Sequence, residues 1–327
     1  MRSAITKDPV IQGISEHRPL YPVKQKELWR MFKKAEASFW TSEEIDIHQD
    51  KADWVKNLGR NDRENLSRLL VSFAISSQNS SLFLTEALLK DVKYREAKFF
   101  FARQLMMENT HYESASLLLD QLTGDRNYIN EIFNTVQTDG SLLHQREWLK
   151  DLSGDDLFRE RLIAMFCAKK LFNTSLHAVL FWFKKKGSLP GLSFWNELIN
   201  RDEKLHAEFS LEIYEHHLED HLESEKVINI VGEAVKITNA ITAEALDEPI
   251  EGLSINELRG YTNYVADKFL AKLFDQQHQA VDHPIPWIDS VTLHQRALSS
   301  TYDQTFNPQG VVVPSDDQKA FDLSEGE

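Results

Sequence analysis

The sequence has little cysteine, proline or glycine and no long apolar run. Its single cysteine, Cys167, excludes a disulfide framework and is typical of a reducing compartment. With 12 Gly and 9 Pro in 327 residues, breakers of regular structure are rare, which favours long helices. No run of about 18 apolar residues occurs, and the N-terminus, MRSAITKDPV, has no apolar core of signal-peptide length. We therefore expect a cytoplasmic protein without membrane segments.

Positive charge is also scarce. The chain carries 37 Lys and Arg against 51 Asp and Glu, a net charge of −14. Such a surface repels polyanions, which argues against nucleic acid or an anionic membrane as the main partner. The hydrophobic content of 42% is enough for a large core in a chain of this length.

What the sequence does contain is apolar residues at the 3.6-residue helical period. The pattern begins at Gln25 and runs through KELWRMFKKAEASFW. Later segments with this period are 62–89, 96–122, 127–138, 141–150, 155–186, 192–221, 223–246 and 255–277. Turn signals such as LTGD, TDGS, KKGSLPG and DEPIEG separate them, and no strand-like alternation competes. We predict an all-α protein built as one large bundle, with an extended N-terminal arm at 1–22.

Two Glu-x-x-His pairs stand out within these segments: Glu108 with His111, and Glu203 with His206. Residues three apart share a helix face, so each pair presents a carboxylate and an imidazole to one point. Two such helices, combined with a carboxylate from each of two others, form the dinuclear metal site of ferritin-like bundles. This ligand set suits Fe or Mn. The alternative is that both pairs are hydrogen-bonded polar groups of the core.

The pattern needs two further carboxylates. Asp46, in SEEIDIHQD, is available for the first. The segment between the two motif helices, LIAMFCAKKLFNTSLHAVLFWF, contains no acid, and Lys169 and Lys170 stand near the expected place. One helical turn after His111, the residue on the same face is Ala115.

Four longer motifs carry a family resemblance: KKAEASFWTSEEID, MMENTHYESASLLLD, FWFKKKGSLPGLSFWNELINRDEKLH and YTNYVADKFL. In order and spacing the chain resembles the radical-generating small subunit of class I ribonucleotide reductase over roughly residues 20–303. The resemblance implies a ferritin-like helical bundle with additional helices at 23–303, and an acidic tail at 304–327 that docks on the large subunit. It also implies a homodimer with a dinuclear Fe/Fe or Mn/Fe site, whose oxidant the large subunit uses to make deoxyribonucleotides.

Position by position, the resemblance implies five metal ligands and two losses. The matching ligands are Asp46, Glu108, His111, Glu203 and His206. The sixth ligand, a glutamate in the family, is replaced by Lys169 or Lys170, and Ala115 stands where the radical-bearing tyrosine is usual.

The radical route toward the large subunit looks retained. By resemblance, Trp29 is the relay tryptophan and Asp202 the acid that links it to a ligand histidine. Tyr302 corresponds to the tyrosine near the subunit boundary.

The two losses leave several hypotheses. The chain is an active small subunit that uses an unusual dinuclear or mononuclear metal or, as some family members with a lysine among the ligands do, no metal. Alternatively, it is a pseudo-subunit that forms a heterodimer with a second, competent small subunit. A ferritin-like oxidase without a large subunit fits less well with Trp29, Asp202, Tyr302 and the acidic tail.

Overall fold

The computed structural model describes residues 8–12, 20–138, 140–154, 157–246, 250–275 and 282–292. These ranges are helical and contain no β-strand, only an isolated bridge between Ile250 and Leu253. The all-α prediction is therefore confirmed. The elements are α1 Pro9–Gln12, α2 Lys26–Ala37, η1 Ser42–Glu44, α3 His48–Lys56, α4 Arg60–Phe83, η2 Leu84–Leu89, α5 Arg95–Thr123, α6 Arg126–Thr138, α7 Gly140–Asp151, α8 Phe158–Lys170, α9 Thr174–Lys185, α10 Pro190–His216, α11 Ser224–Ala245 and α12 Ile255–Leu273.

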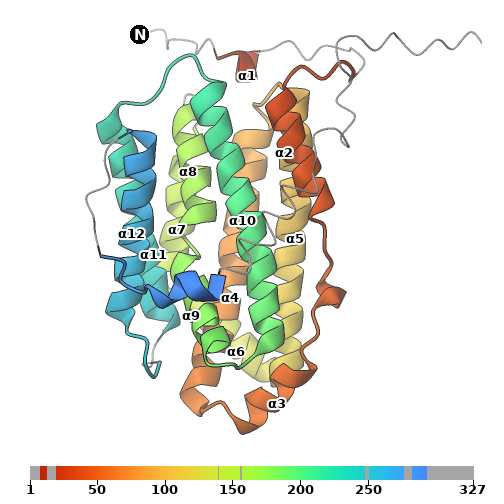
Figure 1. The fold of residues 1–327 in the computed structure, drawn as a ribbon, viewed down its shortest axis with the longest axis vertical. Helices are drawn as coiled ribbons and strands as arrows, with labels where there is room; N and C mark the ends of the chain where they lie inside the picture. Colours follow the sequence, from red (N-terminus) through yellow and green to blue (C-terminus); the bar gives the residue numbers. More distant parts are fainter. Residues whose placement is uncertain are drawn as a thin grey trace, which may run out of the picture.

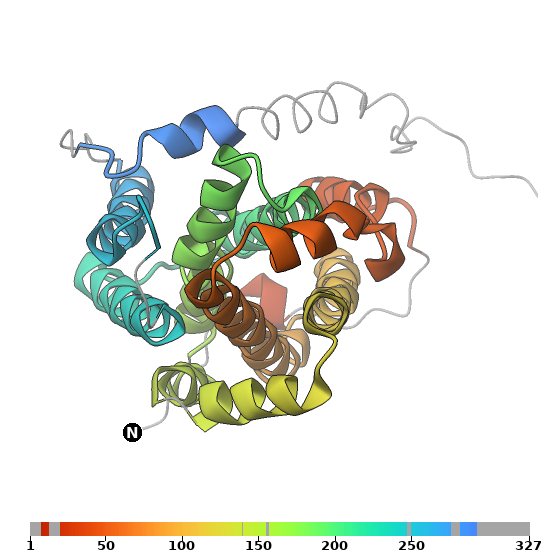
Figure 2. The same ribbon diagram turned by 90° about the horizontal axis from the view of Figure 1, so that it is seen from below.

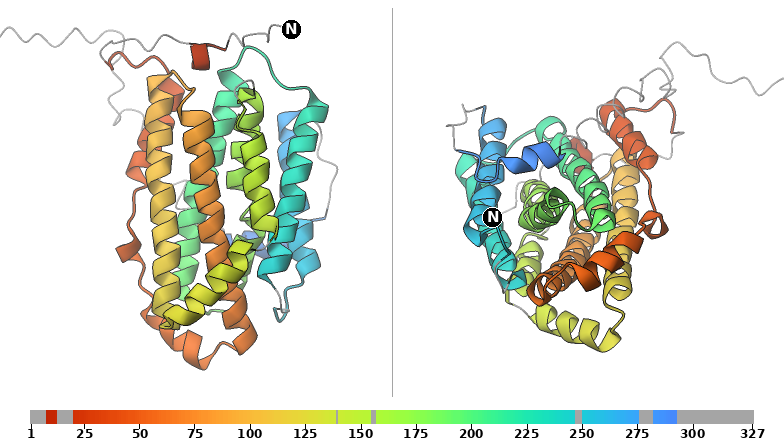
Figure 3. Two further views of the ribbon diagram at one scale, coloured as in Figure 1. Left: turned by 180° about the vertical axis from the view of Figure 1, so that it is seen from behind. Right: turned by 60° about the horizontal axis from the view of Figure 1, so that its bottom comes forward.

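The long helices run side by side and form a bundle (Figure 1). Seen along the bundle, α11 and α12 lie on one side and α2 and α5 on the other (Figure 2). The most extensive packing joins α8 to α10 and α4 to α5, and these four helices surround the centre. Helix α6 crosses the lower end obliquely, against α4 and α5 (Figure 3).

Helix α3 fixes the start of α10, the helix that carries the second Glu-x-x-His pair. The Asp50 carboxylate accepts hydrogen bonds from the backbone N–H groups of Gly191 (2.8 Å) and Leu192 (2.7 Å), and Asp53 accepts one from Leu189 (3.0 Å). Carboxylates satisfy the free N–H groups of a helix start and suit its positive end. The acids of α3 therefore hold α10 in place along its axis.

The predicted helix 155–186 is wrong in one respect, because the chain breaks at 171–173 into α8 and α9. At the break, the N–H groups of both Leu171 and Phe172 donate to the carbonyl oxygen of Cys167, and the N–H of Thr174 donates to Leu171. The side chain of Asn173 donates to Glu203 (3.0 Å) instead of continuing a helix face. A buried polar contact thus competes with the helical ladder, and the apolar period does not reveal it.

Part of the predicted N-terminal arm packs on the bundle. Asp8 and Val10 are buried, and the Asp8 carboxylate lies 3.1 Å from the guanidinium of Arg159. The remaining arm residues, 1–7 and 13–19, and the whole predicted tail, 304–327, lie outside the described residues, so those boundaries stay predictions. Within the described ranges, no helix combines the length and apolar character that crossing a membrane requires.

Candidate functional site

The two Glu-x-x-His pairs meet in the middle of the bundle. Helix α5 supplies Glu108 and His111, and α10 supplies Glu203 and His206. All four residues are at most 2% exposed. Nδ1 of His206 lies 3.4 Å from Oε1 of Glu108, so the pairs from the two helices are in contact. The structure thus brings these four predicted site residues together.

Helix α8 brings a lysine into this cluster. The ammonium of Lys169 lies 2.6 Å from Oε1 of Glu108 and 3.9 Å from Oε1 of Glu203, and its side chain is fully buried. Lys170, one residue later, lines a pocket that adjoins the cluster and that Lys169 also borders. Of the two lysines that the sequence left open, Lys169 therefore occupies the position where the ligand pattern requires a carboxylate.

Helix α4 contributes a serine where the pattern requires the other carboxylate. The Ser77 hydroxyl donates to Oε2 of Glu108 at 2.8 Å, and both side chains are buried. No acid occurs in α4 after Glu64, and the next in the chain is Glu86. The sequence prediction missed Ser77 because serine is not a typical ligand. Its position 31 residues before Glu108, in a serine-rich buried helix, gives no separate signal.

The prediction that Asp46 is a ligand is wrong. Asp46 is exposed, and its carboxylate accepts a hydrogen bond from the backbone N–H of His48 (2.9 Å). Its backbone oxygen lies against Gly191 at the start of α10, where a Cβ added to the glycine would approach it to 2.2 Å. Glu203 is twelve residues further along α10, or about 18 Å at 1.5 Å per residue. Asp46 therefore belongs to the end of the bundle and not to its centre.

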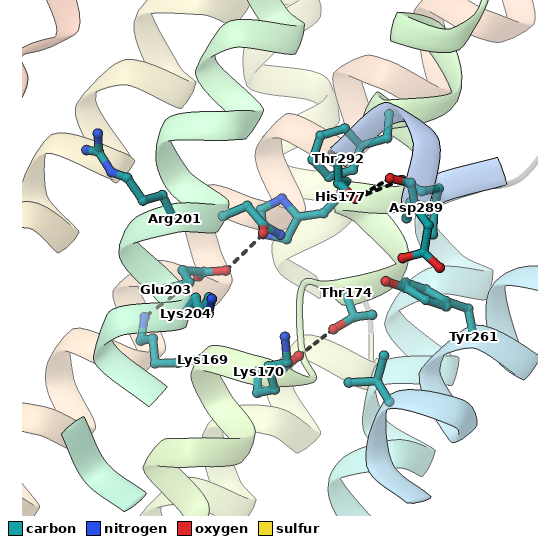
Figure 4. Close-up of a pocket in the computed structure, with 14 residues that line it drawn as sticks. Lys169, Lys170, Thr174, His177, Arg201, Glu203, Lys204, Tyr261, Asp289 and Thr292 are labelled. Atoms are coloured by element: carbon teal, nitrogen blue, oxygen red, sulfur yellow. Dashed lines mark hydrogen bonds and ion pairs between the residues drawn. The ribbon is translucent and has the colours of Figure 1, made fainter. Parts of the chain in front are cut away.

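Glu203 has two further partners, which the sequence analysis did not identify. Asn173 donates to its Oε1 at 3.0 Å, and Nε2 of His177 lies 2.9 Å from its Oε2. Nδ1 of His177 faces Oδ1 of Asn196 (2.5 Å), whose amide nitrogen donates to the His177 carbonyl. Figure 4 shows Lys169 and His177 approaching Glu203 from opposite sides. The start of α9, beyond the unforeseen helix break, thus completes the cluster.

Together these contacts occupy both carboxylates. Each of the four oxygens of Glu108 and Glu203 lies within 3.0 Å of a protein donor: the ammonium of Lys169, the hydroxyl of Ser77, the amide of Asn173 or the imidazole of His177. A metal ion at these oxygens would have to compete with these groups, above all with the ammonium of Lys169.

The charges support the same conclusion. Burial by itself would raise the pKa of Glu108, but Lys169, His206 and His111 together hold it far below its usual range. Burial also opposes ionisation of Glu203, yet His177 and Lys169 lower its pKa. Both carboxylates are therefore ionised at neutral pH. Burial lowers the pKa of His206, so this imidazole is neutral there and carries no charge of its own.

The residues present do not fit a dinuclear metal centre. Such a centre draws carboxylates from four helices, whereas α4 supplies Ser77 and α8 supplies Lys169. A unit charge 4 Å from an ammonium interacts at about 4 kcal/mol with an effective dielectric of 20, and a divalent cation doubles that repulsion. In the described part of the chain, no three His, Cys, Asp or Glu residues are arranged to hold a metal ion.

A hydrogen-bonded chain leads away from this cluster on the α5 side. Nε2 of His111 lies 3.3 Å from Oδ2 of Asp202, and the same oxygen accepts a hydrogen bond from the indole N–H of Trp40 (2.7 Å). The rings of Trp40 and His111 stack with centroids 5.9 Å apart. Burial opposes ionisation of Asp202, but His111 and Arg201 lower its pKa. The structure thus places Asp202 as predicted, between a histidine of the cluster and a tryptophan.

That tryptophan is not the predicted one. Trp29 lies on α2, where its ring packs against Phe32 (centroids 5.1 Å apart) and Phe99 (6.0 Å). The prediction of Trp29 as the partner of Asp202 is wrong, because a second tryptophan, Trp40, follows eleven residues later and reaches the acid instead. Tyr302 lies outside the described residues.

Ala115 is buried beside the cluster, at 1% exposure. The preceding residue, Ser114, accepts a hydrogen bond from the indole N–H of Trp195 (2.8 Å), and the Trp195 ring meets Phe73 edge-on at 5.1 Å. Aromatic side chains therefore pack against this turn of α5. An alanine methyl offers no O–H group to oxidise, so a tyrosyl radical cannot form at position 115.

Comparisons with known proteins show which family the chain is similar to. The family model described as "Ribonucleotide reductase, small chain" matches residues 18–282. The sequence is 33% identical to a ribonucleoside-diphosphate reductase small chain of Arabidopsis thaliana, over 89% of this protein and 87% of that one. It is 35% identical to small chain 1 of Saccharomyces cerevisiae, over 88% and 72% respectively.

Solved structures give the same picture of the fold. The Rnr4 homodimer of Saccharomyces cerevisiae superposes with a TM-score of 0.76 at 27% identity, covering 89% of this chain and 92% of that one. Dimanganese(II)-NrdF of Streptococcus sanguinis superposes with a TM-score of 0.72 over 84% and 98%, and at 18% identity this likeness concerns the fold alone. Both are similar to the present chain in the arrangement of its helices.

Proposed function

Because this chain belongs to the family of ribonucleotide reductase small chains, it is a small subunit of ribonucleoside-diphosphate reductase, and we propose that its buried centre functions without a dinuclear metal. Small subunits of this oxidoreductase supply the oxidant that the large subunit uses to convert ribonucleotides to deoxyribonucleotides. The fold of the chain is the ferritin-like bundle of that family.

One observation carries the proposal: the 2.6 Å contact between the Lys169 ammonium and Glu108 in a fully buried environment. A buried carboxylate requires a partner, and here the partner is part of the chain. Lys169 and Glu108 neutralise each other, while His177 and Asn173 satisfy Glu203. Lys169 thus supplies a positive charge to these carboxylates, and Asn173 and His177 occupy the oxygens of Glu203 that a metal ion would otherwise coordinate.

A second candidate function follows from Ala115 and Ser77. The chain has no oxidisable side chain at position 115, and two of the carboxylates of the metal site are absent. It therefore lacks the groups that make and store an oxidant in the usual way. In this version of the proposal, the chain forms a heterodimer with a metal-competent small chain and contributes its surfaces to the complex with the large subunit. The similar Rnr4 protein has been solved as a homodimer, which supports pairing between chains of this shape.

A reconstitution assay tests both versions. The full chain is incubated with Fe(II) or Mn(II) and oxygen, mixed with the large subunit of its own organism, and assayed for deoxyribonucleotide formation with and without a chelator. The same mixtures are repeated with a metal-competent small chain. We expect any activity of this chain alone to resist chelation. If it is inactive alone, we expect it to raise the activity of the competent chain.

Activity of this chain alone that appears on iron or manganese loading and disappears on chelation would contradict the proposal. Two matched variants refine the result. Trp40→Phe removes the hydrogen bond to Asp202, whereas Trp29→Phe changes a ring that packs elsewhere. If this chain conducts oxidising equivalents, only the Trp40 variant lowers the activity.

A further inference from the structure

A pocket of about 250 Å³ opens beside the buried centre, on the side away from α5. Its walls come from α8, α9, α10, α12 and the segment 282–292 (Figure 4). A volume of this size is several times the share of one water molecule, about 30 Å³. The pocket can therefore hold a small ligand together with ordered water.

The lining of this pocket is cationic, although the protein as a whole carries a net charge of −14. Four of its side chains are basic, namely Lys169, Lys170, Arg201 and Lys204, and two are acidic, Glu203 and Asp289. Most of these charges already have partners. Lys169 pairs with Glu108 and Arg201 with Asp202. Glu203 is bound by His177 and Asn173, and Asp289 lies 3.9 Å from His283.

Lys170 is different. Its side chain points from the end of α8 into the space between Glu203 and Thr174 (Figure 4). Among the described residues, no carboxylate lies within ion-pairing distance of its ammonium. Burial and the nearby charge of Lys204 lower the pKa of Lys170, against the opposing effect of the Glu208 and Glu203 carboxylates. Lys204 itself has only a loose partner on its own helix, Glu208 at 3.7 Å.

The amide of Asn200 also lines the pocket and can donate to a ligand. The hydroxyl groups of Thr174 and Thr292 line it too, but both already donate to backbone carbonyl oxygens of their own segments. Ammonium groups combined with an amide donor are typical partners of a phosphate or another oxyanion, and hydrogen bonds from a charged donor are the strong ones. An anion here would place a negative charge near the ammonium of Lys170 and near that of Lys204, whose carboxylate partner Glu208 is 3.7 Å away.

We propose that this pocket binds a small oxyanion, of the phosphate or phosphate-ester class, held mainly by Lys170 and Lys204. The geometry that carries the proposal is the open pocket, with Lys170 of α8 and Lys204 of α10 both on its lining and the Asn200 amide beside them. The pocket adjoins the buried Glu108–Lys169 pair, since Lys169 also borders it, but the proposal rests on Lys170 and Lys204 and does not depend on whether that pair excludes metal.

The test is calorimetric titration of the full chain with inorganic phosphate at pH 7, with ionic strength held constant by sodium chloride. Parallel titrations with sulfate and acetate distinguish a doubly charged oxyanion from a carboxylate. We expect saturable binding of phosphate, weaker binding of acetate, and a loss of phosphate affinity of about tenfold or more in Lys170→Gln, since a hydrogen bond to a charged group is removed.

Lys204→Gln is a second variant on an exposed side chain and should fold normally; we expect it also to weaken phosphate binding. Lys236→Gln is the matched control, because Lys236 is 76% exposed on α11 and outside the pocket. This variant should bind phosphate with the same affinity as the unmodified chain. The absence of saturable phosphate binding at millimolar concentration, or equal affinity in all three variants, would overturn the proposal. Either failure would leave the proposed role of Lys169 untouched, because the assay measures anion binding through Lys170 and Lys204 and not the ion pair of Lys169 with Glu108.

Discussion

Replacing Lys169 by methionine should lower the free energy of unfolding by about 3–5 kcal/mol, the range seen when one partner of a buried ion pair is removed. Methionine fills a similar volume, so the main change is the loss of the ammonium 2.6 Å from Glu108. Glu108 would then remain as a buried carboxylate with only the Ser77 hydroxyl within 3.0 Å. Denaturant unfolding at pH 7, followed by circular dichroism, measures the change.

Two comparisons make this result specific to the ion pair. Lys236→Met, at an exposed position, should change stability by no more than about 0.5 kcal/mol. The double variant Glu108→Gln/Lys169→Met removes both charges and should recover most of the loss, because neutral replacement of a whole buried pair is often tolerated. If Lys169→Met alone were as stable as the unmodified chain, the ammonium would not be the group that stabilises the Glu108 carboxylate.

The largest change in ligand binding is expected from the double variant Ser77→Asp/Lys169→Glu. It places a carboxylate on α4 and another on α8, beside the Glu-x-x-His pairs of α5 and α10, and so completes the four-helix ligand set. We expect it to bind about two Fe(II) or Mn(II) ions per chain. Binding should also raise the melting temperature, since a ligand that binds only the folded state stabilises it.

The matched control for this variant is Ser77→Asn/Lys169→Gln, which has similar side-chain sizes and no added charge. It should bind no metal. Each single substitution should also fail to bind two ions, because one carboxylate of the set is still missing. If the Asp/Glu variant folds but binds neither Fe(II) nor Mn(II), then Ser77 and Lys169 are not at the two missing ligand positions.

Much of the fold could be predicted from the sequence, because apolar periodicity reports which residues face the core. The long helices correspond to the predicted segments, and the two Glu-x-x-His pairs meet as their spacing indicates. Periodicity could not show the break between α8 and α9, since both sides of it are apolar and the deciding contact, from Asn173 to Glu203, is non-local.

The errors at the site have a common physical cause. Asp46 and Trp29 are residues of the right type near the position that the family resemblance implies. Three-dimensional position depends instead on how α3 meets the start of α10 and on which tryptophan reaches Asp202. His177 and Ser77 were missed because their importance comes from the buried carboxylates that they contact, and those contacts join residues 26 and 31 positions apart in the sequence.

Sequence spacing alone also does not tell which of the two adjacent lysines, Lys169 or Lys170, faces the centre of the bundle. Adjacent helical residues point about 100° apart, so only one can face the centre. The sequence identified the loss of the glutamate but not which lysine replaces it. In the structure Lys169 pairs with Glu108, and Lys170 is left to the neighbouring pocket.

The central claim, that Lys169 and its neighbours take the place of metal in this small subunit, is tested most directly by the metal content of the unmodified chain. The full chain is loaded anaerobically with excess Fe(II) or Mn(II), exposed to oxygen, desalted and analysed by inductively coupled plasma mass spectrometry. We predict no iron or manganese above the level retained by a control protein without a metal site. About two ions per chain, the stoichiometry of a complete four-helix ligand set, would contradict the account.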